Sequence, residues 1–142
     1  MDSRSAAQAL VAHWEEWNVL REPGASEAQI ELFEERQKVS LPADFKAYLR
    51  LADGTDGMDK HVLMFWSIDR IQEYEDLKNV YVFVDYFVWM WAFAIALGSP
   101  DFPDGTILRV GTIPDAVQVS SSFSEFVDMY LKDADKLIFP DD

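Results

Sequence analysis

The spacing of apolar residues predicts that the chain begins with helices. Leu10, Trp14 and Trp17 recur at intervals of three and four residues, so they share one side of a helix predicted over residues 5–20. The Pro23-Gly24 step is expected to end this helix, because both residue types interrupt helical backbone. A first amphipathic helix therefore precedes a sharp break.

Two further helices are predicted from their end signals. Ser26 and Gln29 have the spacing of a capping box, which opens a second helix. The segment SLPADFKAYLRLADG, residues 40–54, predicts a third helix. Pro42 suits its first position, where no amide donor is needed, and Gly54 is a natural stop.

Later segments predict short strands and a closing helix. The patterns give a strand over 62–68, a short helix over 69–77, strands over 106–110 and 116–120, and a helix from 122 to 134. Ser122 and Glu125 form a second capping box at the start of that last helix.

The most apolar stretch, VYVFVDYFVWMWAFAIAL at residues 80–97, contains one charge, Asp85. A membrane helix needs about 20 apolar residues, and the uninterrupted run over 86–100 has fifteen. Large side chains fall on odd positions from Trp89 to Leu97 and smaller ones on even positions, which is the period of a central strand. We therefore predict a buried hairpin. Asp85 lies either in an exposed turn or in the interior with a partner, and its residue type favours the turn.

The order of helices, strands and a final helix predicts an α+β fold. Residues 1–142 are expected to form one domain around an antiparallel or mixed sheet, because repeated strand–helix–strand units are absent from the pattern.

The chain is strongly acidic, with 26 Asp and Glu against 12 Lys and Arg and a formal net charge of -14. This charge disfavours nucleic-acid binding and favours a basic protein partner. Solubility alone explains the charge equally well. The absence of cysteine and of an apolar leader near the N-terminus is consistent with a cytoplasmic protein.

No catalytic or metal-binding motif is evident in the sequence. The two histidines, His13 and His61, lack the spacing of a zinc helix and are interpreted as structural or solvated. Asp53, Asp56 and Asp59 could gather a cation, but their spacing fails the EF-hand pattern and is typical of a polar turn. We therefore expect no enzyme activity, no cofactor and no metal.

Three segments together are similar to a known superfamily. They are PGASEAQIELFEERQKVSLPADFKAYLRLADG, YVFVDY and VQVSSSFSEFVDMYL, and they span residues 23–134 in the right order. The chain resembles the SUKH superfamily, whose eukaryotic members include the Smi/Knr-type cell-wall assembly regulators. Asp53-Gly54 stands where the family tends to have Asn-Gly, and Tyr86-Phe87-Val88 stands where it often has a glycine turn.

The resemblance implies an α+β fold with one mixed sheet, no enzyme activity and no cofactor. Many bacterial domains of this kind are similar to immunity proteins that bind a toxin, often a nuclease, and keep it inactive inside the producing cell. The first hypothesis is therefore an immunity protein, a monomer or weak homodimer, that covers a basic toxin domain with an acidic surface. The residues predicted to form that surface are Asp53, Asp56, Asp59, Glu73, Glu75 and Asp76.

Two alternatives remain open. A regulatory scaffold of the cell-wall assembly regulator type would recognise a cellular protein, and the absence of an upstream toxin gene would favour it. A small-molecule binder would use an aromatic face made by Trp89 and Trp91, and an empty pocket beside those rings would support it.

Overall fold

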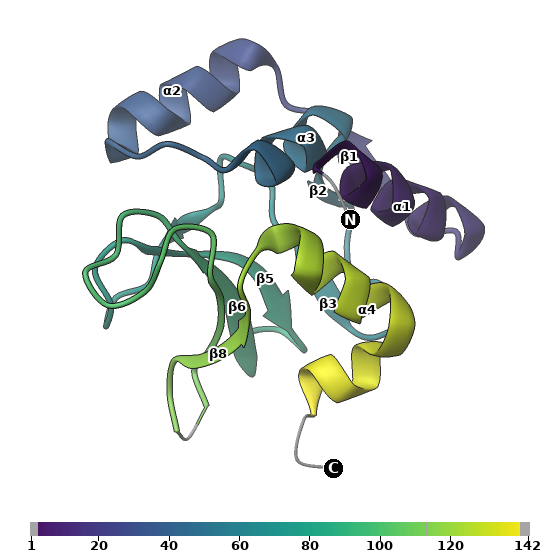
Figure 1. Ribbon diagram of the computed structural model, residues 1–142. Coiled ribbons are helices and arrows are strands. Elements are labelled where there is room, and N and C mark those ends of the chain that lie inside the picture. The colour runs from purple at the N-terminus through teal and green to yellow at the C-terminus, as the bar shows by residue number, and fades with distance from the viewer. Residues whose placement is uncertain (1–2, 113, 140–142) are drawn as a thin grey trace.

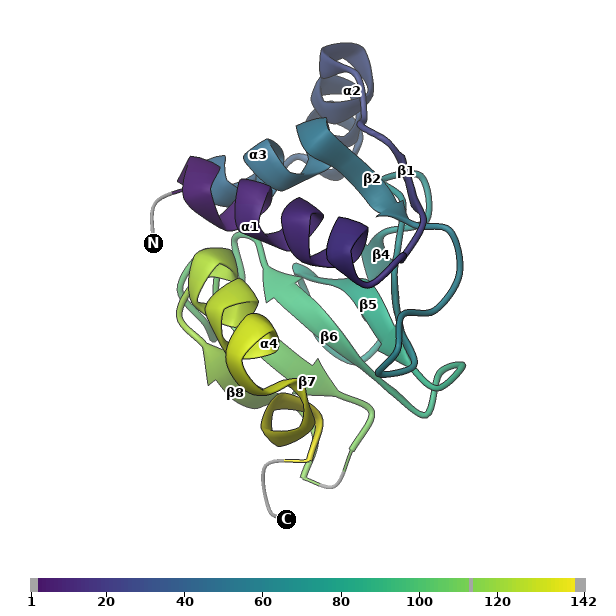
Figure 2. The same ribbon diagram turned by 90° about the vertical axis from the view of Figure 1, so that its right-hand side faces the viewer.

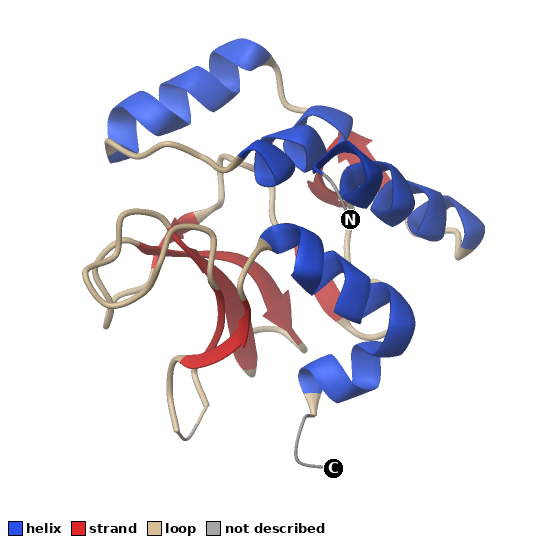
Figure 3. Cartoon of the chain, viewed as in Figure 1, coloured by secondary structure: helices blue, strands red, loops and turns tan. Residues whose placement is uncertain are grey.

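The helices gather on one side of an antiparallel sheet. The computed structural model describes residues 3–112 and 114–139 and places the helices above and beside the strands (Figures 1 and 3). Turned by 90°, the molecule shows α1 and α4 in front of the strands (Figure 2). The predicted α+β fold is confirmed.

The chain forms four helices and eight strands over the described residues. In order they are α1 (Ser3–Glu16), β1 (Arg21–Pro23), α2 (Glu27–Gln37), α3 (Ala43–Leu51), β2 (Ala52–Thr55), β3 (Leu63–Phe65), β4 (Gln72–Glu73), β5 (Val80–Tyr86), β6 (Trp91–Ala96), β7 (Ile107–Val110), β8 (Val117–Ser120) and α4 (Phe123–Ile138).

The main sheet has the order β3-β5-β6-β7-β8, and every pairing is antiparallel. The short strand β4 pairs with β5 as well, beside the part of β5 that β3 leaves free. β1 and β2 form a separate two-stranded ribbon. Of the two predicted sheet types, the antiparallel one forms.

The apolar stretch at 80–97 is the central hairpin of this sheet, as predicted. β5 and β6 pair along their length, with a bulge at Phe83, because Val82 faces Ala94 while Val84 faces Phe93. In the described part of the chain, no helix is long and apolar enough to cross a membrane.

The hairpin presents different side chains to its two sides. Phe93 contacts Phe126 of α4, so the odd positions of β6 face the helices. The even positions, Ala92, Ala94 and Ala96, therefore face away from α4. The predicted separation of large and small residues is correct for β6, but Trp89 lies in the turn before that strand.

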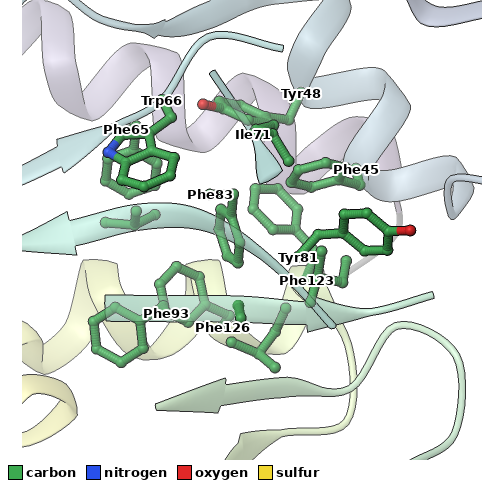
Figure 4. Packing of buried hydrophobic residues seen from close by; sticks show 14 of the residues in the cluster. Phe45, Tyr48, Phe65, Trp66, Ile71, Tyr81, Phe83, Phe93, Phe123 and Phe126 are labelled. Atoms are coloured by element: carbon green, nitrogen blue, oxygen red, sulfur yellow. The ribbon is translucent and has the colours of Figure 1, made fainter. Parts of the chain in front are cut away.

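Aromatic rings fill the space between the helices and the sheet. Phe83 meets Phe45 of α3 at 5.4 Å between ring centroids and Phe126 of α4 at 5.6 Å. Figure 4 shows these rings with Phe123 between helices and strands. A second contact is polar: Trp14 Nε1 donates to the buried Tyr130 hydroxyl at 3.1 Å and joins α1 to α4.

The capping signals are confirmed. Ser26 Oγ accepts the Gln29 amide at 3.1 Å, and the Gln29 side chain accepts the Ser26 amide at 2.8 Å. Ser122 Oγ accepts the Glu125 amide at 3.1 Å. α4 continues beyond the predicted end to Ile138, with a non-helical residue inside it. The sequence leaves two alternatives for the tail over residues 138–142, which either packs through Phe139 or frays. Phe139 meets the Tyr86 ring at 5.5 Å between ring centroids, and residues 140–142 lie outside the described residues.

Three segments differ from the predictions, and each difference comes from tertiary contact. The first helix ends at Glu16 instead of near residue 20, because residues 21–23 form β1. The third helix ends at Leu51 instead of near Gly54, because residues 52–55 form β2 and pair with β1. At Gly24 an added Cβ would lie 1.8 Å from the Arg50 carbonyl oxygen, which explains the glycine there. The helix predicted over 69–77 is wrong, because residues 72–73 pair with the open edge of β5.

Removing the Phe83 side chain tests where the core lies. Phe83→Ala is expected to lower the free energy of unfolding by about 3–5 kcal/mol, because a buried ring is lost and a cavity remains. Urea unfolding followed by tryptophan fluorescence measures this loss. Phe87→Ala is the control: this residue is 53% exposed, so a change of about 0.5 kcal/mol or less is expected. Equal losses in the two variants would contradict this arrangement.

Candidate protein-interaction surface

Asp85 is a buried acid in the middle of the sheet. Its residue is 2% exposed and pairs with Met64 on one side and Ala92 on the other. Trp66 Nε1 donates to Asp85 Oδ2 at 2.6 Å, and Arg70 Nη2 lies 3.5 Å from the same oxygen. The favoured turn position of Asp85 is therefore wrong, and the alternative of a buried acid with partners is correct. β5 continues through Asp85 because β3 pairs with it on one side and β6 on the other.

A stack of side chains rises from Asp85 on the sheet face that points away from α4. The Arg70 guanidinium lies 4.3 Å from the centroid of the Trp66 ring, a cation–π contact. Trp66 also meets the Trp89 ring edge-on at 4.7 Å. Asp85 therefore fixes Trp66, and Trp66 supports the ring of Trp89 in the hairpin turn.

The turn that carries Trp89 is apolar and open to solvent. Its four consecutive residues have these exposed fractions: Phe87 53%, Val88 73%, Trp89 48% and Met90 60%. We call residues 87–90 the apolar tip. Single exposed apolar residues are ordinary, whereas a contiguous exposed apolar group is a candidate for contact with another molecule.

The backbone of the apolar tip is strained. Phe87, Val88 and Trp89 have φ angles of 47°, 52° and 70°, in the left-handed region. Each non-glycine residue there costs about 1–2 kcal/mol, and a β-branched residue such as Val88 is a rare occupant. Strain of this kind persists where the surrounding structure holds it, here through the Met90 amide, which donates to the Tyr86 carbonyl at 2.9 Å.

Two of the six predicted acids lie beside the apolar tip. Glu73 and Glu75 line a hollow of about 250 Å³ together with Trp89 and Val82. Glu73 also accepts the Asn79 amide at 2.6 Å, which fixes its position. Asp76 is exposed in the same segment of chain but does not line this hollow.

Tyr74 also lines this hollow. Its hydroxyl donates to Asp115 at 2.8 Å, so the side chain reaches from the segment after β4 to the loop between β7 and β8. Burial and then the carboxylate of Asp115 raise the pKa of Tyr74 to about 12. The hydroxyl is therefore a neutral donor at physiological pH, and it ties the loop between β7 and β8 to the segment after β4.

Two more of the predicted acids meet at a second place. Asp53 and Asp56 line a hollow of about 500 Å³ with Glu22 and Arg70. Asp53 Oδ1 accepts the Ile68 amide at 2.6 Å. Burial raises the pKa of Asp53 despite that hydrogen bond, and the charges of Asp69 and Glu22 add to the effect. Sequence reasoning missed Glu22, because only the β1–β2 pairing brings it to this hollow.

The sixth acid, Asp59, differs from the others because it is buried, with 8% exposure. Its carboxylate accepts the amides of His61 at 2.8 Å and Leu63 at 3.0 Å, and the hydroxyl of Tyr130. Asp59 thus joins the loop before β3 to α4 and does not add charge to the surface. The candidate interaction surface therefore does not include Asp59.

Both histidines pack against Tyr130. The ring centroid of His13 lies 5.5 Å from that of Tyr130, and the centroid of His61 lies 6.2 Å away. Burial lowers the pKa of His13, and the charge of Lys60 lowers it further. Within residues 3–112 and 114–139, no group of three His, Asp or Glu side chains could hold a metal ion.

The aromatic face that was predicted from Trp89 and Trp91 does not form. Trp91 stacks on Tyr86 at 4.5 Å and meets Phe139 at the end of α4. Trp89 contacts Trp66 on the other side of the sheet. The positive φ angles of the turn break the period of two on which the prediction rested.

A family model matches most of the sequence. The model of the SMI1/KNR4 family (SUKH-1) matches residues 24–129, which run from just before α2 into α4. The chain belongs to the SMI1/KNR4 family (SUKH-1). No curated protein matches the chain.

The SUKH-1 match includes the apolar tip and both acidic hollows except for Glu22 and Pro23. α1 lies outside the matched residues, yet Trp14 is fully buried and bonded to Tyr130. In this SUKH-1 chain, α1 is therefore part of the same core.

Replacing Val88 with glycine tests the strain in the apolar tip. Val88→Gly is expected to raise the free energy of unfolding by about 0.5–1 kcal/mol, because glycine adopts the left-handed conformation without a clash. The matched control is Leu32→Gly, at an exposed helical position in α2, which is expected to lower it by about 1 kcal/mol. Urea midpoints measure both. A loss of stability in Val88→Gly would show that this turn is not strained.

Because the pKa of Asp53 is raised in the folded protein, removing its charge is expected to stabilise the fold at neutral pH but not in acid. A carboxyl group with a raised folded pKa contributes stability below its unfolded pKa. That contribution is lost as the pH rises through the folded pKa. Asp53→Asn keeps an oxygen for the Ile68 amide and removes the charge. It is expected to raise the urea midpoint at about pH 7 and to leave it unchanged at about pH 3.

The control for this pH effect is Asp101→Asn, at an exposed loop position. We expect it to change the midpoint little at either pH. A gain for Asp53→Asn that is as large in acid as at neutral pH would contradict the assigned cause.

Proposed function

We propose that this SUKH-1 protein is a non-enzymatic immunity protein that binds a basic toxin domain and covers its active site. The observation that carries the proposal is the apolar tip, four exposed residues in a strained turn, next to a hollow whose lining includes the acidic residues Glu73 and Glu75. Apolar residues held open to water at a cost in strain serve contact with another molecule better than they serve stability.

The two components of this surface have different roles in binding. Trp89 and Met90 offer side chains that can be buried at the centre of an interface, where most of the affinity arises. The acidic residues around them, within a chain of net charge -14, attract a basic partner from a distance and speed association. The surface is therefore suited to a basic protein rather than to a nucleic acid.

The regulatory alternative rests on the same family match, because the SMI1/KNR4 model does not separate immunity proteins from regulators. Both functions would use a protein-binding surface. A toxin gene directly upstream favours immunity, and its absence favours a regulator.

The small-molecule alternative has less support. The hollow beside Trp89, at about 250 Å³, is smaller than the range of about 300–1,000 Å³ for sites that hold drug-sized ligands.

Binding kinetics with the toxin domain encoded upstream test the proposal. Between about 20 and about 300 mM salt, the association rate is expected to fall by about tenfold or more, because salt screens the acidic surface. The double variant Phe87→Ser/Met90→Ser is expected to speed dissociation by about tenfold or more, because apolar contact area is lost.

Leu32→Ser, at an exposed apolar position in α2, is the matched control and is expected to leave both rates unchanged. Co-expression in cells gives the biological readout: wild type and Leu32→Ser protect against the toxin, and the tip variant protects less. An association rate that does not change with salt concentration, together with full protection by the tip variant, would contradict the proposal.

A further inference from the structure

One arginine on the helix-facing side of the sheet is buried among apolar neighbours. Arg109 of β7 is 9% exposed. It pairs with Phe93 of β6, whose ring meets Phe126 of α4 at 5.2 Å between ring centroids. Because cross-strand partners point to the same face, the Arg109 side chain also leaves the sheet on the side of α4. Val117 of β8 pairs with Arg109 on its other side, so both adjacent strands present an apolar residue to it.

The guanidinium of Arg109 has no ionic partner in the described part of the chain. Its Nε atom is buried and makes no hydrogen bond, and no carboxylate of residues 3–112 or 114–139 forms an ion pair with it. A buried charge of this kind is unfavourable, because the loss of hydration is not offset by attraction to an opposite charge. The chain has 26 acidic residues, so a general shortage of carboxylates does not explain the unpaired arginine.

A second buried donor lies on the same face. Trp91 precedes Phe93 by two residues on β6, and its ring meets Phe139 at the end of α4. The Trp91 Nε1 atom is buried and makes no hydrogen bond among the described residues. Trp91 and Arg109 are therefore diagonal neighbours beside Phe93. Indole and guanidinium nitrogens donate and do not accept hydrogen bonds, so a group that binds here must supply acceptor atoms.

We propose that Arg109 binds a carboxylate, with the indole of Trp91 as a neighbouring donor on the same face. A guanidinium presents two parallel N–H donors that match the two oxygens of a carboxylate. Burial keeps water from the pair and strengthens it. One carboxylate neutralises the single charge of Arg109, whereas a phosphate dianion would add negative charge to a chain whose net charge is already -14.

Two sources can supply this carboxylate. The chain itself ends in Asp141 and Asp142, two and three residues after Phe139, and the Phe139 ring lies 5.7 Å from that of Trp91. Three residues of extended chain span about 10 Å, so these acids follow directly from a residue that is already on this face. A separate molecule, such as a protein partner, is the other source. The chemistry at Arg109 is the same in both cases.

The test uses the full chain and sodium acetate as the probe, with sodium chloride at matched ionic strength as the reference. In an NMR titration we follow the Nε–H signal of Arg109, which is identified by its loss in Arg109→Met. This signal is expected to shift saturably with a dissociation constant of about 10–100 mM, the range that one charge-assisted pair provides.

The same titration distinguishes the two sources. If a separate molecule is the source, the wild type responds to acetate, and Asp141→Asn/Asp142→Asn responds equally. If Asp141 and Asp142 are the source, they compete with the probe at a high effective concentration, so the wild type responds weakly and the tail variant responds strongly.

Stability gives a second readout, measured in whichever of these two chains responds to acetate. A ligand that binds only the folded state raises the urea midpoint. Arg109→Met keeps the apolar stem and is expected to show a smaller rise in acetate than its parent. Arg109→Lys keeps the charge without the fork and is expected to bind acetate at least about threefold more weakly. The matched control is Arg36→Met, at an exposed position of α2, and it is expected to behave like its parent.

Two results would overturn the carboxylate site. One is the absence of a saturable shift in both the wild type and Asp141→Asn/Asp142→Asn. The other is an equal rise of the urea midpoint in Arg109→Met and Arg36→Met, because acetate would then act as a general stabilising salt and not as a ligand of Arg109.

Discussion

The placement of one buried carboxylate organises the face of the sheet on which the candidate surface lies. Asp85 is held by the indole of Trp66 and the guanidinium of Arg70. A buried acid without such partners would be strongly unfavourable, so these two residues cannot move away without destabilising β5. Because Trp66 also supports Trp89, the requirement to satisfy Asp85 extends outward to the hairpin turn.

The two faces of the sheet have different roles. The face toward α3 and α4 is filled with aromatic rings that pack edge to face, and it gives the fold its stability. The opposite face carries the alanines of β6 and is covered by loop segments. One of them is the segment after β4, whose Tyr74 hydroxyl donates to Asp115. Loops that a rigid sheet positions are where binding sites commonly arise, and both acidic hollows lie among them.

Features that reduce stability occur together with features that suit binding. The left-handed turn at 87–89 and the half-exposed Trp89 each lower the stability of the folded state, and Glu73 and Glu75 beside them have no ion-pair partner among the described residues. They lie within one region beside β5, whereas Asp59, which was predicted at the surface, is fully used inside the fold. This concentration is what a binding surface requires, since the rest of the domain supplies the stability that the surface lacks.

Local signals in the sequence determined the capped helices, the central hairpin and the α+β class, because capping and side-chain periodicity act between residues a few positions apart. The sequence also identified Glu73 and Glu75 as acids of interest, but it could not bring them to Trp89 or separate them from Asp59. Tertiary structure alone decided that residues 72–73 pair with β5, that Asp85 is buried and that the turn adopts positive φ angles. Each of these depends on residues distant in the chain, whose positions no local pattern records.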